Sequence, residues 1–442
     1  MLYRTLQVIV NIFYRIFYRL EIRNIKNVPK SGPIRLAPNH TNAFIDPVIS
    51  CMLFWRRVQF FARGDVFKGR IAIFLLRSMN ISPMYRMQEG YSEVKKNDKT
   101  FEECKNLLSK NRAILIFPEG ICVKERRLRK LKKGLARILF MAAEEFDFKK
   151  DIKVIPVGMN YEDSKKIRSK LCIDFGEPLS VMDYIEKFKV DKVRTINEFT
   201  EDLEPKMREV MVVVEDPEND TLMKGLEEMF LHPMMKEKGF DDHDLEKDYL
   251  VTKEIAEIVN HFQKSDIEKL NSLRENVVPY IDELHARKLR DHLLRPESIL
   301  KLSTWRFVLD FFVIWFGTPI YWMGMIMNHP PYILAEKLAS KKAKNPEFHP
   351  SIEVNLTWIL WFIYYGSQLL TIALVFRSWP FLGIYGLIVP FTLFHCIRFD
   401  PMMRKILGRW RLMRLVRKEK AVVERLMFKR EEIKIEFESL RV

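Results

Sequence analysis

The chain has few cysteines, and their spacing carries no recognisable pairing. None of the five belongs to a Cys-x-x-Cys motif; they are Cys51, Cys104, Cys122, Cys172 and Cys396. This scatter argues against a disulfide framework and against a cysteine-based metal site, and it is typical of a protein kept in a reducing compartment. A cleavable signal peptide is not expected either, because the N-terminal run lacks a small-residue cleavage site and contains three arginines.

The chain also lacks the signatures of nucleic-acid binding, although its net charge is +16 over 442 residues. Such a charge suits either nucleic acid or an anionic membrane surface and phosphorylated substrates. No zinc-finger, helix-turn-helix or RRM motif is present. Long apolar segments in the last third of the chain favour the membrane. We therefore expect membrane lipids, and no nucleic acid, among its partners.

Residues 23–215 show the alternation typical of an α/β domain with a mostly parallel sheet. Helix-like stretches over 101–110 and 134–145 stand between short apolar runs. The runs expected to form strands are 34–37, 58–62, 113–117, 154–158 and 171–175. In such folds the functional residues lie on loops at the ends of strands.

The remaining segments differ from this domain and from one another. Residues 1–22 mix aromatics, aliphatics and arginines, which suits an interfacial or membrane-anchoring helix. Residues 216–300 are expected to form a charged helical module of unassigned role, 301–400 membrane helices, and 401–442 a basic cytoplasmic helical tail.

The positive-inside rule predicts an integral membrane protein whose α/β domain and basic tail share the cytoplasmic side. That arrangement needs an even number of crossings, whereas three apolar segments are candidates: 305–327, 356–376 and 381–397. Pro319 would allow the first to be broken, re-entrant or interfacial, so the number of crossings stays open.

Two short motifs follow predicted strands and carry the chemistry. His40 stands a short loop before Asp46, which precedes Pro47 and is therefore expected to cap a helix. A histidine oriented by an aspartate can take a proton from a hydroxyl near neutral pH. Phe117-Pro118-Glu119-Gly120 ends the second strand with another acid. Alternatively, His40 and Asp46 are structural residues of a loop and a helix cap.

The surroundings of these motifs narrow the chemistry. No serine or cysteine occupies a nucleophile elbow, so the substrate's own hydroxyl would be the nucleophile. No further histidine or cysteine clusters nearby, so a metal site is not expected.

Four ordered segments resemble the glycerolipid acyltransferase family, which includes glycerol-3-phosphate and lysophosphatidic acid acyltransferases. They are Asn39-His40 with Asp46-Pro47, Asn80–Arg86, Phe117–Gly120 and Val154–Gly158. Five residues separate His40 from Asp46, one more than in most of the family. This spacing resembles the fungal-type branch that acylates glycerol-3-phosphate or dihydroxyacetone phosphate. The Thr-Arg pair that commonly follows Phe-Pro-Glu-Gly is replaced by Ile121-Cys122.

The resemblance implies a membrane-bound enzyme of phospholipid synthesis. It would move a fatty acyl group from acyl-CoA or acyl carrier protein to a hydroxyl of a phosphorylated glycerol acceptor, with no tightly bound cofactor. His40 would be the general base and Asp46 its orienter. The substrate-binding residues that it implies are Arg86, Glu119, Gly120, Asn39 and Lys133. Two alternatives stay open: a lysophosphatidic acid acyltransferase, and a non-catalytic lipid-binding membrane scaffold.

Overall fold

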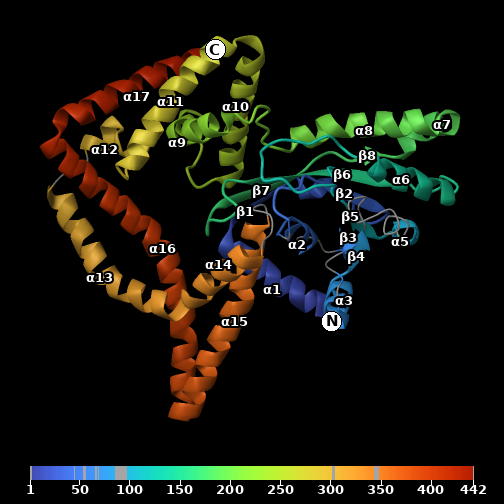
Figure 1. The fold of residues 1–442 in the computed structure, drawn as a ribbon, viewed down its shortest axis with the longest axis horizontal. Helices are drawn as coiled ribbons and strands as arrows, with labels where there is room; N and C mark the ends of the chain where they lie inside the picture. The colour runs from blue at the N-terminus through green and yellow to red at the C-terminus, as the bar shows by residue number, and fades with distance from the viewer. Residues whose placement is uncertain are drawn as a thin grey trace. The chain divides into compact units, whose positions relative to one another are not determined.

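The computed structural model describes residues 2–43, 45–52, 56–64, 67, 69–84, 97–300, 304–342 and 348–441. The chain folds as two compact units, Met1–Val213 and Val214–Val442 (Figure 1). The predicted site residues that the structure describes all lie in the first unit.

The first unit is built on a mostly parallel sheet, which confirms the predicted fold class. Within the described residues the sheet has eight strands in the order β1-β7-β6-β2-β5-β3-β4, and β8 pairs with β6. Strands β7 and β8 pair antiparallel with β6, and β1, which pairs in parallel with β7, runs in the same direction as β7. The strands are β1 (Arg19–Arg23), β2 (Ile34–Pro38), β3 (Val58–Arg63), β4 (Ile81–Met84), β5 (Ala113–Leu115), β6 (Lys153–Tyr161), β7 (Lys170–Phe175) and β8 (Leu179–Ser180).

Helices cover this sheet, and the central strands are buried as a consequence. All five residues of β2 are buried, as expected for a strand covered on both faces. One core cluster joins Ala37 of β2 to α5, α6 and α8. The helices of this unit are α1 (Leu2–Phe17), α2 (Ile45–Met52), α3 (Arg70–Ser78), α5 (Asn97–Ser109), α6 (Gly134–Glu145), α7 (Ile185–Val190) and α8 (Lys192–Glu209).

The segment expected as an N-terminal helix over 1–22 contains two elements. Helix α1 buries Phe13, Tyr14 and Phe17 against the unit. Residues 19–22 belong to β1, which pairs in parallel with β7 at the edge of the sheet. A membrane-anchoring role of α1 stays a prediction.

The second unit is helical throughout its described residues (Figure 1). Three of its helices are long and apolar enough to cross a membrane, with mean hydropathies of 1.4 to 1.7. Helix α16 is continuous over 40 residues, so the expected boundary at residue 400 falls inside it. The helices are α9 (Asn219–Glu237), α10 (Leu245–Ser265), α11 (Ile267–Ala286), α12 (Pro296–Leu300), α13 (Thr304–Asn328), α14 (Pro330–Lys342), α15 (His349–Phe376), α16 (Trp379–Lys418) and α17 (Lys420–Leu440).

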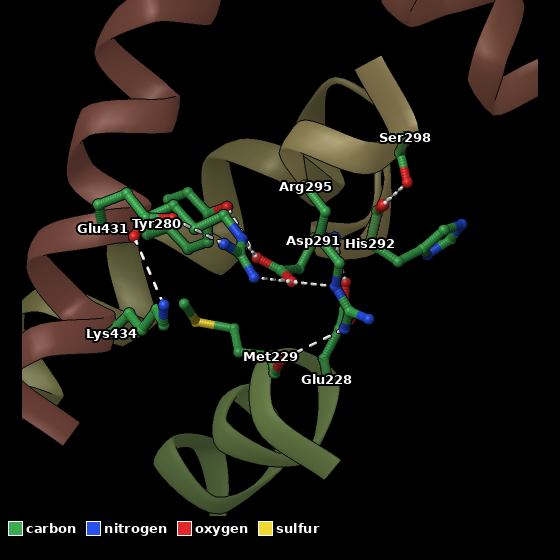
Figure 2. A network of polar contacts seen from close by, with 10 residues as sticks. Glu228, Met229, Tyr280, Asp291, His292, Arg295, Ser298, Glu431 and Lys434 are labelled. Carbon is green, nitrogen blue, oxygen red and sulfur yellow. Dashed lines mark hydrogen bonds and ion pairs between the residues drawn. The ribbon is translucent and has the colours of Figure 1, made fainter. Parts of the chain in front are cut away.

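A buried polar network fixes the last helix of this unit, α17, to the helices that precede the three long apolar helices (Figure 2). Asp291 is fully buried and accepts hydrogen bonds from Arg430 Nε of α17 at 2.9 Å and from the Tyr280 hydroxyl of α11 at 3.0 Å. Its backbone N–H donates to Glu228 of α9 at 3.2 Å. A buried carboxylate is tolerated only with such partners. Residues 216–300 and the C-terminal tail therefore pack together.

Candidate active site

The loop between β2 and α2 brings His40 onto Asp46. His40 Nδ1 lies 3.0 Å from Asp46 Oδ2, and the same oxygen accepts the backbone N–H groups of Thr41 and Asn42 at 2.8 and 2.7 Å. Helix α2 begins at Ile45, so Asp46 stands in its first turn rather than at the predicted cap position. Its side chain turns back toward the loop that precedes the helix, and this explains how a five-residue spacing still joins the pair.

The other oxygen of Asp46 is held by a residue that the sequence did not reveal. Tyr161, at the end of β6, donates its hydroxyl to Asp46 Oδ1 at 2.7 Å. Burial raises the pKa of Tyr161 well above its ordinary value, and the charge of Asp46 raises it further, so the tyrosine donates as a neutral phenol. Asp46 is fully buried, and hydrogen bonds on both oxygens fix its orientation.

The His40 ring is fixed in position with one nitrogen left for chemistry. It stacks on Phe117 with ring centroids 3.8 Å apart and an interplanar angle of 15°. A carboxylate can only accept, so Nδ1 carries the proton and Nε2 presents a lone pair. None of the residues that the structure describes hydrogen-bonds to Nε2. The side chain is 11% exposed, so the ring is largely shielded from solvent but can still be reached by a substrate.

Glu119 connects the loop that carries His40 to the basic loop of residues 124–133. Its Oε1 accepts the backbone N–H of His40 at 2.9 Å, and its Oε2 accepts that of Arg129 at 3.1 Å. Burial raises the pKa of Glu119 to about 7, against the opposing effect of these two donors. Since both oxygens already accept backbone groups, the carboxylate braces two loops. The implied contact with a glycerol hydroxyl stays a prediction.

The other implied substrate residues take different positions around this pair. Gly120 has a φ of +71°, and a Cβ there would lie 3.3 Å from Lys132 Cγ, so the turn favours glycine. Asn39 is buried and accepts the Met159 N–H at 2.6 Å, which ties the end of β2 to β6. Lys133 immediately precedes α6 and is exposed. The implied phosphate ligand Arg86 lies outside the described residues.

Tyr161 belongs to none of the motifs identified in the sequence, but the position of its strand in the predicted sheet could have pointed to it. It is a polar residue at the carboxyl end of the strand that pairs with β2, and β2 leads directly into His40. In a parallel pair such ends lie at the same edge. The pairing of β2 with β6, rather than with another strand, is what the sequence left open.

Comparisons with known proteins point to one family. Residues 19–160 match the sequence model of the family described as Acyltransferase. An uncharacterized acyltransferase of Schizosaccharomyces pombe is 26% identical over 261 residues, covering 55% of this chain and 35% of that protein. Glycerol-3-phosphate O-acyltransferases 1 and 2 of Saccharomyces cerevisiae are 22% and 24% identical, covering 61% and 58% of this chain and 35% and 34% of theirs. The chain thus spans about a third of the length of these relatives.

Among solved structures, a 1-acyl-sn-glycerophosphate acyltransferase from Thermotoga maritima aligns with 46% of this chain and 79% of its own. The identity is 15% and the TM-score is 0.31.

Proposed function

We propose that this chain, whose residues 19–160 form a domain of the acyltransferase family, is a membrane-bound glycerolipid O-acyltransferase. Its acceptor is a hydroxyl of glycerol-3-phosphate or dihydroxyacetone phosphate, and its donor is a fatty acyl thioester. The names of the two Saccharomyces cerevisiae relatives support glycerol-3-phosphate as the acceptor. The observation that carries the chemistry is the hydrogen bond between His40 Nδ1 and the buried Asp46.

The reaction couples two proton transfers, to His40 and back from it, to one acyl transfer. His40 Nε2 takes the proton of the acceptor hydroxyl as its oxygen attacks the carbonyl carbon of the thioester. The tetrahedral intermediate then collapses with cleavage of the carbon–sulfur bond. The departing sulfur takes the proton back from the imidazolium, which yields an ester and a free thiol. Nothing is oxidised or reduced.

Asp46 and its donors prepare His40 for this step. The carboxylate holds Nδ1–H, which directs Nε2 to the substrate, and its negative charge stabilises the imidazolium that forms. Tyr161 and the two backbone N–H groups prevent Asp46 from rotating away. General-base catalysis of this kind contributes about 10²- to 10⁴-fold.

The acceptor's phosphate is assigned to two basic side chains, Arg86 and Lys133. A guanidinium such as that of Arg86 can grip a phosphate through paired donors, and Lys133 adds a point charge at the end of the basic loop. Glu119 and Gly120 shape the loop that faces the acceptor, and Asn39 fixes the end of β2. We place this site on the cytoplasmic face of the membrane, as the basic tail predicts.

Activity measurements on the full chain in lipid nanodiscs test this proposal. The protein is given a long-chain acyl-CoA or acyl carrier protein with glycerol-3-phosphate, dihydroxyacetone phosphate or lysophosphatidic acid. His40→Ala is expected to lose about 10²- to 10⁴-fold in kcat. His261→Ala, in the second unit, is the matched control and should retain activity. Equal turnover by wild type and His40→Ala would refute the general base.

The acceptor panel separates the rival functions. Product from lysophosphatidic acid alone assigns the protein to the second acylation step, and no product with any acceptor and either donor favours the lipid-binding scaffold. Arg86→Ala is expected to raise KM for phosphorylated acceptors by about 10-fold or more, with KM for the donor unchanged. If KM were unaltered for every acceptor, Arg86 would not be part of the site.

A further inference from the structure

The loop that follows β5 holds His40 at three points. Two of them are on the main chain of the histidine. Its N–H donates to the Glu119 carboxylate at 2.9 Å, and its carbonyl accepts the Val123 N–H at 3.0 Å. The third contact is on the imidazole itself, which stacks on the ring of Phe117. Of the three, only this stack acts directly on the group that takes the proton.

The sheet places the Phe117 ring beside the histidine. Strands β2 and β5 are parallel neighbours, with Leu36 opposite Leu115. The Ile116 N–H extends this pairing by donating to the Leu36 carbonyl at 3.2 Å. Both chains then leave the sheet at the same edge. The main chain of Phe117 is fixed as well, because its carbonyl accepts the Gly120 N–H at 3.2 Å. The position of the phenyl ring therefore follows from the strand register.

The phenyl ring lies where it meets the positive charge that proton transfer creates. The ring centroids of His40 and Phe117 are 3.8 Å apart, and the interplanar angle is 15°. The face of a phenyl ring is partially negative and attracts a cation that lies within about 6 Å of its centroid. An imidazolium is attracted more strongly than a neutral imidazole. The contact therefore strengthens as the proton arrives, and interactions of this kind raise kcat.

Phe117 and Asp46 act on different parts of the imidazole. Asp46 accepts Nδ1–H at the edge of the ring, and Phe117 covers one face. The His40 side chain is only 11% exposed, and a cation over an aromatic face is held more strongly where water is partly excluded. With one face covered, the acceptor hydroxyl reaches Nε2 in the plane of the ring or from the opposite face.

We propose that Phe117 is a positioning residue for His40: its ring fixes the plane of the imidazole and stabilises the imidazolium that forms during acyl transfer. This inference rests on the proposed function, in which His40 is the general base. Phe117 acts through the histidine and needs no contact with the substrate. Its ring should contribute about 2- to 30-fold to kcat, the range expected for a cation over an aromatic face.

Substitutions in the full chain in lipid nanodiscs test the role of the ring, with acyl-CoA and glycerol-3-phosphate as substrates. Phe117→Leu keeps an apolar side chain and should lower kcat by about 2- to 30-fold, with KM for both substrates within about twofold of wild type. Phe188→Leu is the matched control, because Phe188 stacks on Phe140 at 4.6 Å in the same unit. It should lower stability and leave kcat unchanged. Wild-type kcat in Phe117→Leu, a rise in KM alone, or an equal fall in the control would overturn the assignment.

Fluorinated phenylalanines at position 117 separate the charge of the ring face from its shape. Each fluorine withdraws electron density from the face and changes the volume of the ring little. The logarithm of kcat should fall stepwise from phenylalanine through its monofluoro, difluoro and trifluoro forms. A kcat that does not change along this series would overturn the stabilisation of the imidazolium.

His40→Ala, measured in parallel, distinguishes this failure from a failure of the proposed function. If His40→Ala turned over as fast as wild type, the general base itself would be wrong. If His40→Ala lost activity while the fluorinated series stayed level, only the role of Phe117 would be wrong.

Discussion

Replacing Asp46 by asparagine separates the charge of this side chain from its shape. The amide oxygen can accept the N–H groups of Thr41 and Asn42 where Oδ2 does now. The amide nitrogen can face Tyr161, whose hydroxyl is able to turn and accept. The variant should therefore keep the fold of the loop and lose only the negative charge beside the imidazole.

The distance in the structure sets the expected size of the effect. Two unit charges at the 3.0 Å that joins Asp46 Oδ2 to His40 Nδ1 attract by about 3–6 kcal/mol at an effective dielectric constant of about 20–40. That stabilisation of the imidazolium corresponds to a loss of about 10²- to 10⁴-fold in kcat.

Steady-state measurements of kcat with acyl-CoA and glycerol-3-phosphate check this effect. Asp174→Asn is the matched control, because Asp174 is another buried aspartate of the same sheet and accepts from Arg23 at 2.6 Å and Asn24 at 2.8 Å. It should lower stability and leave kcat unchanged. An Asp46→Asn variant with wild-type kcat would refute the proposed role of the carboxylate. An equal loss in the control would point to general destabilisation instead.

Three further predictions follow from other contacts. Tyr161→Phe should lower kcat about 10-fold by removing a hydrogen bond to a charged group, whereas Tyr18→Phe, which loses a bond to the Ser164 carbonyl, should not. Because burial raises the pKa of Glu119 from 4.5 to about 7, its contribution to stability is present below pH 4.5 and lost as the pH rises through 7; Glu119→Gln should flatten the fall of Tm between pH 5.5 and 8. Arg430→Met should destabilise the protein by about 3–5 kcal/mol in thermal unfolding, because it removes the cation that hydrogen-bonds to the buried Asp291 and leaves only Arg295, 3.6 Å away.

The sequence predicted the central strands and missed the marginal ones for a physical reason. Strand β2 is apolar along most of its length because both of its faces are covered, and such a run is easy to identify. Strand β1 alternates charged and aliphatic residues and is half-exposed throughout, as an edge strand can be. Strand β8 has only two residues. Neither leaves a hydrophobic pattern long enough to recognise.

The site was predictable where its geometry is local and unpredictable where it is not. His40 lies in the loop before α2 and Asp46 in the first turn of that helix, so their spacing was sufficient to pair them. Tyr161 reaches Asp46 from 115 residues away, and this contact exists only because β6 pairs with β2 in a register that sets Pro38 opposite Val157. Glu119 was identified as important, but the sequence could not tell which donors its carboxylate would meet.

The two backbone hydrogen bonds that Glu119 accepts couple the position of His40 to that of the basic loop. A phosphate that displaces the loop around Arg129 when it binds also displaces the main chain of His40, because the Glu119 carboxylate is bonded to both. Phosphate binding and proton transfer to His40 then both depend on the position of Glu119. Substitutions between Lys124 and Lys133 should consequently change kcat together with KM, because loosening the grip on the acceptor also shifts the atom that receives its proton.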